Sequence, residues 1–168
     1  KGRLHEAANN LGGMSAMLTY RFYTARLGMF EDQYDEAEAD LSYVYLNCPS
    51  TPTGTANRRR ALRYLIPVRL QRGVLPSMEL LAEYDLTGMF GDVVLGLRCG
   101  NLQLFNDGLR SNAHAFMRSG TFLLLEKCKV LCYRNLFKRV HTVTGKTQMP
   151  LGDLTLTFKW LGVEVDDD

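Results

Sequence analysis

The strongest hydrophobic pattern lies at Thr121–Val140, where apolar residues cover every side of a helical wheel over the first dozen positions. These residues are Phe122, Leu123, Leu124, Leu125, Cys128, Val130, Leu131 and Cys132. A helix that is apolar all round is typical of a protein interior. The pattern therefore predicts a single core helix at this place.

The second half of this predicted helix is basic. Arg134, Lys138 and Arg139 follow the apolar run with no acid among them. Lys127, Arg134 and Lys138 are seven and four residues apart, so they share one stripe of the helix. We expect this basic end to stay open to solvent and to receive an anionic partner.

Helical spacing recurs along the rest of the chain, and the alternation typical of strands does not. We expect further helices over Met14–Glu31, Tyr34–Asn47, Asn57–Gln71, Ser77–Tyr84, Gly88–Arg98, Asn101–Arg118 and Pro150–Trp160. Loops are expected at Ser50–Ala56 and His141–Met149, and Pro67 predicts a kink inside its helix. The chain is therefore expected to be all-α, with helical hairpins stacked side by side.

The first expected hairpin partly matches the tetratricopeptide pattern of small, aromatic, large and proline positions. The matching residues are Ala25, Tyr34, Ala37, Leu41, Val44 and Pro49. Arg21 stands where that pattern has tryptophan, so an ordinary helical hairpin is an equal alternative. The last two expected helices look like the start of a helix-turn-helix, with Phe158, Trp160 and Leu161 in its core.

Charge is segregated although the 168-residue chain has a formal net charge of only +2. Arg58–Arg72 holds six arginines and no acid, whereas the helix face with Asp35, Glu36, Glu38 and Asp40 is acidic and expected to be solvated. Such segregation favours electrostatic attraction of partners. Arg58, Arg59, Arg60 and Arg63 form a secondary basic patch. The patch predicts a phosphate contact or a nuclear localisation element, or else a solvated first helical turn paired with the acidic face.

No arrangement typical of catalysis or metal binding is present. Cys128 and Cys132 have a spacing that two zinc ligands could use, but no second Cys/His pair accompanies them. Buried free thiols in a reducing compartment are the better interpretation. The Gly145–Thr147 triplet lacks the preceding glycine and strand of a phosphate-binding loop, and the three histidines are far apart in sequence. We expect no enzyme activity, no metal, no cofactor and no small-molecule substrate.

No targeting or membrane segment is apparent. The chain lacks a signal-peptide pattern, and its longest apolar run is far shorter than a membrane span. We therefore expect no membrane partner. Lys1 is not an initiator residue and the chain stops in an acidic run, so a fragment of a longer protein is expected.

Several segments resemble the PCI-domain-containing protein 2 family. They are Tyr64–Val68, Glu79–Leu81, Tyr84–Leu86, Gly100–Leu102 and Leu123–Arg139. Phe122–Lys127 and Tyr133–Arg139 are the most specific of them, and the mid-helix Pro67 agrees as well. Relatives of COP9 signalosome subunit 12 share much of this pattern.

The resemblance implies a PCI domain, in which tetratricopeptide-like helical repeats lead into a winged helix. Residues 1–120 would form the repeats, and residues 121–168 the central helix and the first part of a winged helix whose remainder is missing. It further implies a non-catalytic scaffold subunit of the TREX-2 transcription–export complex. Its partners would be a larger GANP-type PCI scaffold, a small acidic Sem-type protein, and RNA or DNA, in the nucleus, at the nuclear pore and in the cytoplasm.

The candidate binding residues are those on which the resemblance centres. They are Lys127, Arg134, Asn135, Lys138 and Arg139. Two alternatives remain open: a module that binds nucleic acid directly, or a PCI subunit of an assembly like the signalosome or the proteasome lid.

Overall fold

The computed structural model describes residues 2–145 and 151–160, with side chains from residue 13 onward except residues 153 and 154. All elements in these ranges are helices and none is a strand, as the sequence predicts. Two compact units are present, residues 1–69 and 70–168. The expected boundary between repeats and winged helix at residue 120 stays a prediction, and Pro150, Leu161 and Gly162 lie outside the described residues.

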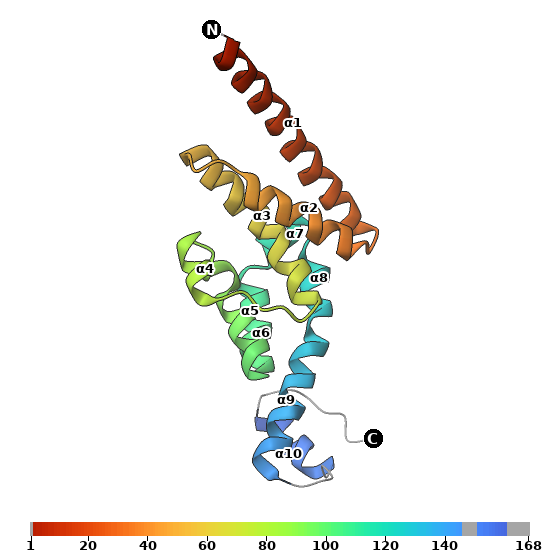
Figure 1. Ribbon diagram of the computed structural model, residues 1–168. Coiled ribbons are helices and arrows are strands. Elements are labelled where there is room, and N and C mark those ends of the chain that lie inside the picture. The colour runs from red at the N-terminus through yellow and green to blue at the C-terminus, as the bar shows by residue number, and fades with distance from the viewer. Residues whose placement is uncertain (1, 146–150, 161–168) are drawn as a thin grey trace. The chain divides into compact units, whose positions relative to one another are not determined.

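In the first unit, α1 (Gly2–Phe30) and α2 (Tyr34–Asn47) form an antiparallel hairpin (Figure 1). The turn is closed by a hydrogen bond from the Gln33 amide to the Gly28 carbonyl at 2.9 Å. Ala25 and Ala37 are only 2% and 0% exposed, so small side chains let the two helices approach closely. This hairpin confirms the predicted pair of helices, although α1 begins at Gly2 and not at the predicted Met14.

Arg21 occupies the position that tryptophan has in the tetratricopeptide pattern. Its guanidinium lies 4.2 Å from the ring centre of Tyr43 and donates to Asp40 at 2.8 Å. Glu38 of the same helix α2 accepts a hydrogen bond from Arg69 at 3.0 Å. The expectation of an entirely solvated acidic face was therefore wrong, since two of its carboxylates are paired with arginines.

The third helix, α3 (Pro52–Gln71), begins earlier than the sequence analysis predicted and continues through Pro67. The hydroxyl of Thr51 accepts a hydrogen bond from the Gly54 amide at 3.1 Å, which caps the first turn. Pro52 takes the first helical position, where its missing N–H costs nothing. The segment Ser50–Ala56, predicted as a loop, thus contains the helix start, and the predicted start at Asn57 lies inside α3.

The second unit contains seven helices within the described residues (Figure 1). They are α4 (Met78–Glu83), α5 (Thr87–Cys99), α6 (Leu102–Ser111), α7 (Ala113–Ser119), α8 (Phe122–Lys127), α9 (Lys129–Thr144) and α10 (Leu151–Trp160). Ser77, predicted as the first helical residue, caps α4, with its hydroxyl accepting from the Leu80 amide at 3.1 Å. Helix α5 packs against α4, α6 and α9 and forms the centre of this unit.

Two predicted helices are broken in the structure. The predicted helix Asn101–Arg118 is interrupted at Asn112, whose side-chain amide donates to the Gly88 carbonyl at 3.1 Å. The predicted helix Thr121–Val140 is interrupted at Cys128. Helix α9 then runs to Thr144 and ends at Gly145, whose φ is +62°, so the predicted turn at His141 is still helical.

Glycines allow the helices around α5 to cross at short distance. A Cβ atom on Gly96 would lie 2.6 Å from the Phe105 amide nitrogen, and one on Gly100 would lie 2.4 Å from that of Leu136. Both distances are too short for any side chain, so α6 and α9 pack directly on the backbone of α5. This close packing fixes the position of α9, which carries the candidate site.

Candidate partner-binding surface

Cys128 marks the junction between α8 and α9 without changing the helical handedness. Its φ of −67° and ψ of −11° remain in the right-handed helical region. A face of α8 therefore continues approximately as a face of α9. Cys128 and Cys132 are fully buried, as predicted, and burial raises their pKa to about 12 and about 11, respectively.

An exposed face of α8 and α9 carries basic and apolar side chains in alternation, and we call it the mixed stripe. It consists of Leu123, Lys127, Val130, Arg134 and Lys138. The three cationic residues are exposed, and Leu123 and Val130 are 69% and 71% exposed. The expectation that the apolar residues of this segment are all core was therefore wrong for two of them.

The spacing of the mixed stripe was visible in the sequence. Leu123, Lys127, Val130 and Arg134 follow one another at intervals of four, three and four residues, which keeps them on one helical face. The basic members were predicted to lie on the surface and the apolar members in the core. Because the apolar and the basic members lie on the same side of the helix, exposure of the basic members implies exposure of the apolar members. The prediction missed this signal.

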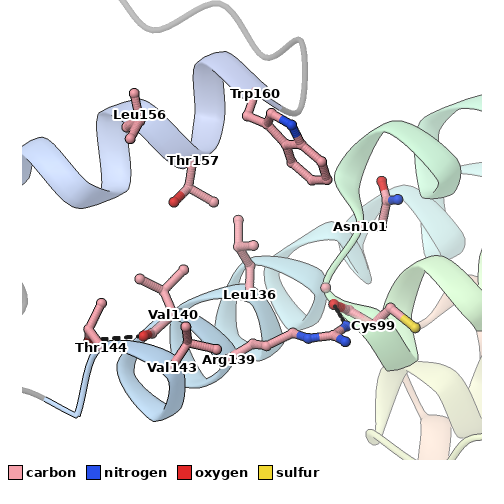
Figure 2. Close-up of a pocket in the computed structure, with 11 residues that line it drawn as sticks. Cys99, Asn101, Leu136, Arg139, Val140, Val143, Thr144, Leu156, Thr157 and Trp160 are labelled. Carbon is pink, nitrogen blue, oxygen red and sulfur yellow. Dashed lines mark hydrogen bonds between the residues drawn. The ribbon is translucent and has the colours of Figure 1, made fainter.

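The other two candidate residues make contacts within the chain. The side-chain amide of Asn135 donates to the Leu97 carbonyl at 2.8 Å, and Asn135 is half-buried. Arg139 is exposed, and its guanidinium donates to the Cys99 carbonyl at 3.1 Å (Figure 2). Both side chains thus hold α9 to the end of α5. Their predicted contact with a partner remains a prediction.

A groove of about 750 Å³ lies between α9, α10 and the junction of α5 and α6, and none of the mixed-stripe residues lines it (Figure 2). Its apolar lining comes from Leu136, Val140, Val143, Leu156 and Trp160. Trp160 is 81% exposed, so its expected place in a helix-turn-helix core was wrong.

Helix α10 is attached to α9 through a different residue. Phe158 lies edge-on to Tyr133 and Phe137, with ring centres 5.9 and 6.0 Å apart. Its predicted packing role is thereby confirmed.

The secondary basic patch lies on α3 in the first unit. Arg58 is half-buried and donates to the Cys48 carbonyl at 2.6 Å, whereas Arg59 and Arg60 are exposed. Because α3 begins at Pro52, these arginines lie beyond the first turn, and the interpretation as a solvated first turn was wrong. Burial also raises the pKa of the Cys48 thiol, an effect that the nearby Arg58 cation partly opposes.

Within the described residues, no three His, Cys, Asp or Glu side chains are grouped as metal ligands would be. Over the same ranges, none of the helices combines the length and the apolarity that crossing a membrane requires.

The chain is similar to several characterised proteins over nearly all of its length. It is 34% identical over 157 residues to the PCI domain-containing protein 2 homolog of Dictyostelium discoideum, covering 92% of the chain and 36% of that protein. It is 38% identical over 146 residues to the Drosophila melanogaster homolog, covering 87% and 36% of the two chains. PCI domain-containing protein 2 of Danio rerio is 38% identical over 156 residues, which cover 92% of the chain and 38% of that protein.

The chain thus spans little more than a third of the length of these relatives. A plant protein from Arabidopsis thaliana, called enhanced ethylene response protein 5, is 34% identical over 157 residues. A scan against protein-family models finds none that matches the chain.

Proposed function

Because the chain belongs to the PCI domain-containing protein 2 family, we propose that it acts as a non-catalytic scaffold segment of a PCI-type complex. The complex we propose is the TREX-2-like machinery that couples transcription to mRNA export. The mixed stripe carries this proposal, because it exposes three cations and two large aliphatic side chains on one face of α8 and α9.

The mixed stripe suits a small acidic protein of the Sem type. Carboxylates of such a partner would pair with Arg134 and Lys138, and its apolar side chains would cover Leu123 and Val130. Fully burying one aliphatic side chain contributes about 1.5–3 kcal/mol, whereas an exposed ion pair contributes about 1 kcal/mol or less. Affinity would therefore come mainly from the two aliphatic residues, and the charges would set orientation and the rate of association.

The proposed role requires binding groups rather than reactive ones. The buried thiols of Cys128 and Cys132 have a pKa raised to about 12 and about 11, so they stay protonated and are not thiolate nucleophiles at neutral pH. A larger GANP-type PCI scaffold completes the proposed complex. The corresponding locations are the nucleus, the nuclear pore and the cytoplasm.

A pull-down with purified partners tests this function. We expect a variant with Val130→Glu, Arg134→Glu and Lys138→Glu to lose capture of the Sem-type protein. The matched control Arg110→Glu changes one exposed arginine on α6 and should retain capture. Normal capture of the Sem-type protein, the larger scaffold and RNA by the triple variant would contradict the proposal.

Direct binding of nucleic acid is the second candidate function, and the exposed cations of the mixed stripe favour it. Contacts to three or four phosphates would give a slope of roughly −3 to −4 in a plot of log affinity against log salt concentration. Gel shifts of the isolated chain with single- and double-stranded oligonucleotides at low salt test this function. Absence of a shift at about 10 µM protein, on the scale of nonspecific affinities, would dismiss it.

A scaffold role in an assembly like the signalosome or the proteasome lid would use the same surface. Mass spectrometry of co-purified proteins separates this assembly from the export machinery. Recovery of signalosome or lid subunits in place of a GANP-type scaffold would favour the former.

A further inference from the structure

Two arginines in the unit of residues 1–69 rest on aromatic rings. The guanidinium carbon of Arg26 lies 5.0 Å from the ring centre of Tyr64 and 6.0 Å from that of Phe22. The guanidinium carbon of Arg60 lies 5.7 Å from the Phe22 ring centre. Phe22 and Tyr64 themselves pack edge to face, with ring centres 5.4 Å apart. Two cations, one from α1 and one from α3, thus contact a single aromatic pair.

Neither guanidinium has an acidic partner within the described part of the chain. Arg21, one turn earlier on α1 than Arg26, is paired with Asp40 at 2.8 Å. The Nε atom of Arg26 is buried and has no hydrogen-bond acceptor among the described residues. Buried donors in folded proteins are nearly always paired. An anion bound at Arg26 and Arg60 would supply the acceptor that the Arg26 Nε lacks and would balance the charge of both cations.

A groove of about 530 Å³ extends along the same surface and includes Phe22 and Arg60 in its lining. Its apolar walls include Met14, Leu18 and Val44. Aliphatic walls of this kind bury leucine-sized side chains, whereas the sugars and phosphates of a nucleic acid carry no aliphatic group of that size to fill them. The anion is therefore best supplied by a carboxylate on a peptide that also carries aliphatic residues.

The side-chain amides at the groove fit a peptide as well. Asn57 lines it and offers a donor and an acceptor for peptide N–H and C=O groups, while Asn47, whose side-chain amide donates to the Tyr43 carbonyl at 2.8 Å, offers its acceptor oxygen. Planar guanidinium groups pair with carboxylates through two parallel hydrogen bonds, and stacking on aromatic rings holds Arg26 and Arg60 in place for this pairing.

We propose that Arg26 and Arg60 form a carboxylate-binding site for an acidic, leucine-containing segment of a partner protein, whose aliphatic side chains enter the adjoining groove. This site belongs to α1 and α3, so it is separate from the mixed stripe on α8 and α9. The Arg26 and Arg60 variants leave the mixed stripe unchanged, so a loss of peptide binding in these variants is assigned to this site whether or not the function proposed above holds.

Fluorescence anisotropy of the whole chain with a labelled peptide tests the site. The probe is a fluorescein-labelled peptide of alternating leucine and glutamate, and a uridine oligonucleotide of equal net charge serves as the comparison. We expect Arg26→Gln and Arg60→Gln each to weaken peptide binding about tenfold, the loss expected for a charge-assisted hydrogen bond. The matched control Arg118→Gln, an exposed arginine on α7, should stay within about twofold of the wild type, since nothing at the site involves it.

Arg60 is exposed, so the Arg60→Gln variant is expected to fold. This variant alone therefore tests the proposal if Arg26→Gln does not fold. Three results would overturn the proposal. They are no binding of the peptide at about 100 µM, an equal loss of affinity in R118Q, and binding of the oligonucleotide in place of the peptide with the same dependence on Arg26 and Arg60.

Discussion

The side-chain amide of Asn135 on α9 donates a hydrogen bond to the Leu97 carbonyl in the last turn of α5 at 2.8 Å. This bond joins two helices whose residues are 38 positions apart in the sequence. Asn135 therefore has a structural role inside the same segment whose exposed cations are proposed to bind partners.

Replacing Asn135 with alanine should lower the free energy of unfolding by about 1–2 kcal/mol, because a part-buried carbonyl loses a hydrogen-bond donor. Urea denaturation followed by circular dichroism measures this change. Arg134→Ala, one position earlier and exposed, should stay within about 0.5 kcal/mol of the wild type. Unchanged stability of N135A together with loss of partner capture would instead make Asn135 a direct contact residue.

Gly100 combines a left-handed backbone with a very short distance to α9. Its φ is +66°, and an added Cβ would lie 2.4 Å from the Leu136 amide nitrogen. Gly145 has a similar φ of +62°, with open space where a Cβ would be. We expect Gly145→Ala to cost about 1 kcal/mol from backbone strain alone, and Gly100→Ala to cost more than about 3 kcal/mol, because α9 must also move. Equal urea midpoints for the two variants would contradict the observed packing of α9 on α5.

The buried thiols lead to a prediction about reactivity. At pH 8, a disulfide reagent should label Cys99 rapidly, because its side chain is exposed. Cys48, Cys128 and Cys132 are buried, and burial raises the pKa of each thiol, so they should react only after unfolding in urea. Rapid labelling of Cys128 or Cys132 in the native protein would show that the α8–α9 junction opens.

The same thiols predict how stability depends on pH. Below the ordinary thiol pKa of 9.0, the thiols of Cys128 and Cys132 are protonated in both the native and the unfolded chain. Their contribution to the free energy of unfolding therefore does not change with pH in this range. Between pH 9.0 and about 11 to 12, the unfolded chain releases protons that the native chain retains, so stability falls as pH rises. A Cys128→Ala, Cys132→Ala double variant lacks the two thiols, so its comparison with the wild type isolates their contribution from that of other groups. The variant should lose less stability than the wild type between pH 8 and about pH 10. Equal losses in both proteins would contradict the raised pKa values.

The presence of a helix could be predicted from the sequence where the spacing of apolar residues agrees with residues typical of helix ends. Helix α2 was predicted with its observed bounds because Leu41 and Val44 mark its inner face and Pro49 follows its end. The start of α3 was missed because Thr51 and Pro52 were interpreted as loop residues. The same pair is also a capping residue followed by proline at the first helical position, and the sequence alone does not choose between these interpretations.

The break inside the predicted helix Asn101–Arg118 depends on a tertiary contact. Asn112 donates to the Gly88 carbonyl, an acceptor that only the fold brings near. Likewise, the sequence of α8 and α9 predicts the basic side of the mixed stripe but not the exposure of Leu123 and Val130. An apolar residue looks the same in a sequence whether it covers the core of its own chain or the surface for a partner.

Phe158 and Leu156 on α10 allow the attachment of this helix to be tested. Phe158 lies between Tyr133 and Phe137, and each edge-to-face pair contributes about 0.5–1.5 kcal/mol beyond burial. Leu156 is 72% exposed on the side of the groove. Phe158→Ala should therefore lower the free energy of unfolding by about 1–3 kcal/mol, and Leu156→Ala should change it by about 0.5 kcal/mol or less.

Trp160 supplies a direct optical signal for the same helix, because it is the one tryptophan of the chain. With 81% of its surface exposed, its fluorescence should be quenched by acrylamide nearly as strongly in the native protein as in urea. A partner that fills the groove between α9 and α10 would shield the indole and reduce quenching, and Phe158→Ala would abolish this shielding by releasing α10. If the native protein alone already shields Trp160 from acrylamide, the groove is closed in solution and cannot receive a partner in the observed arrangement.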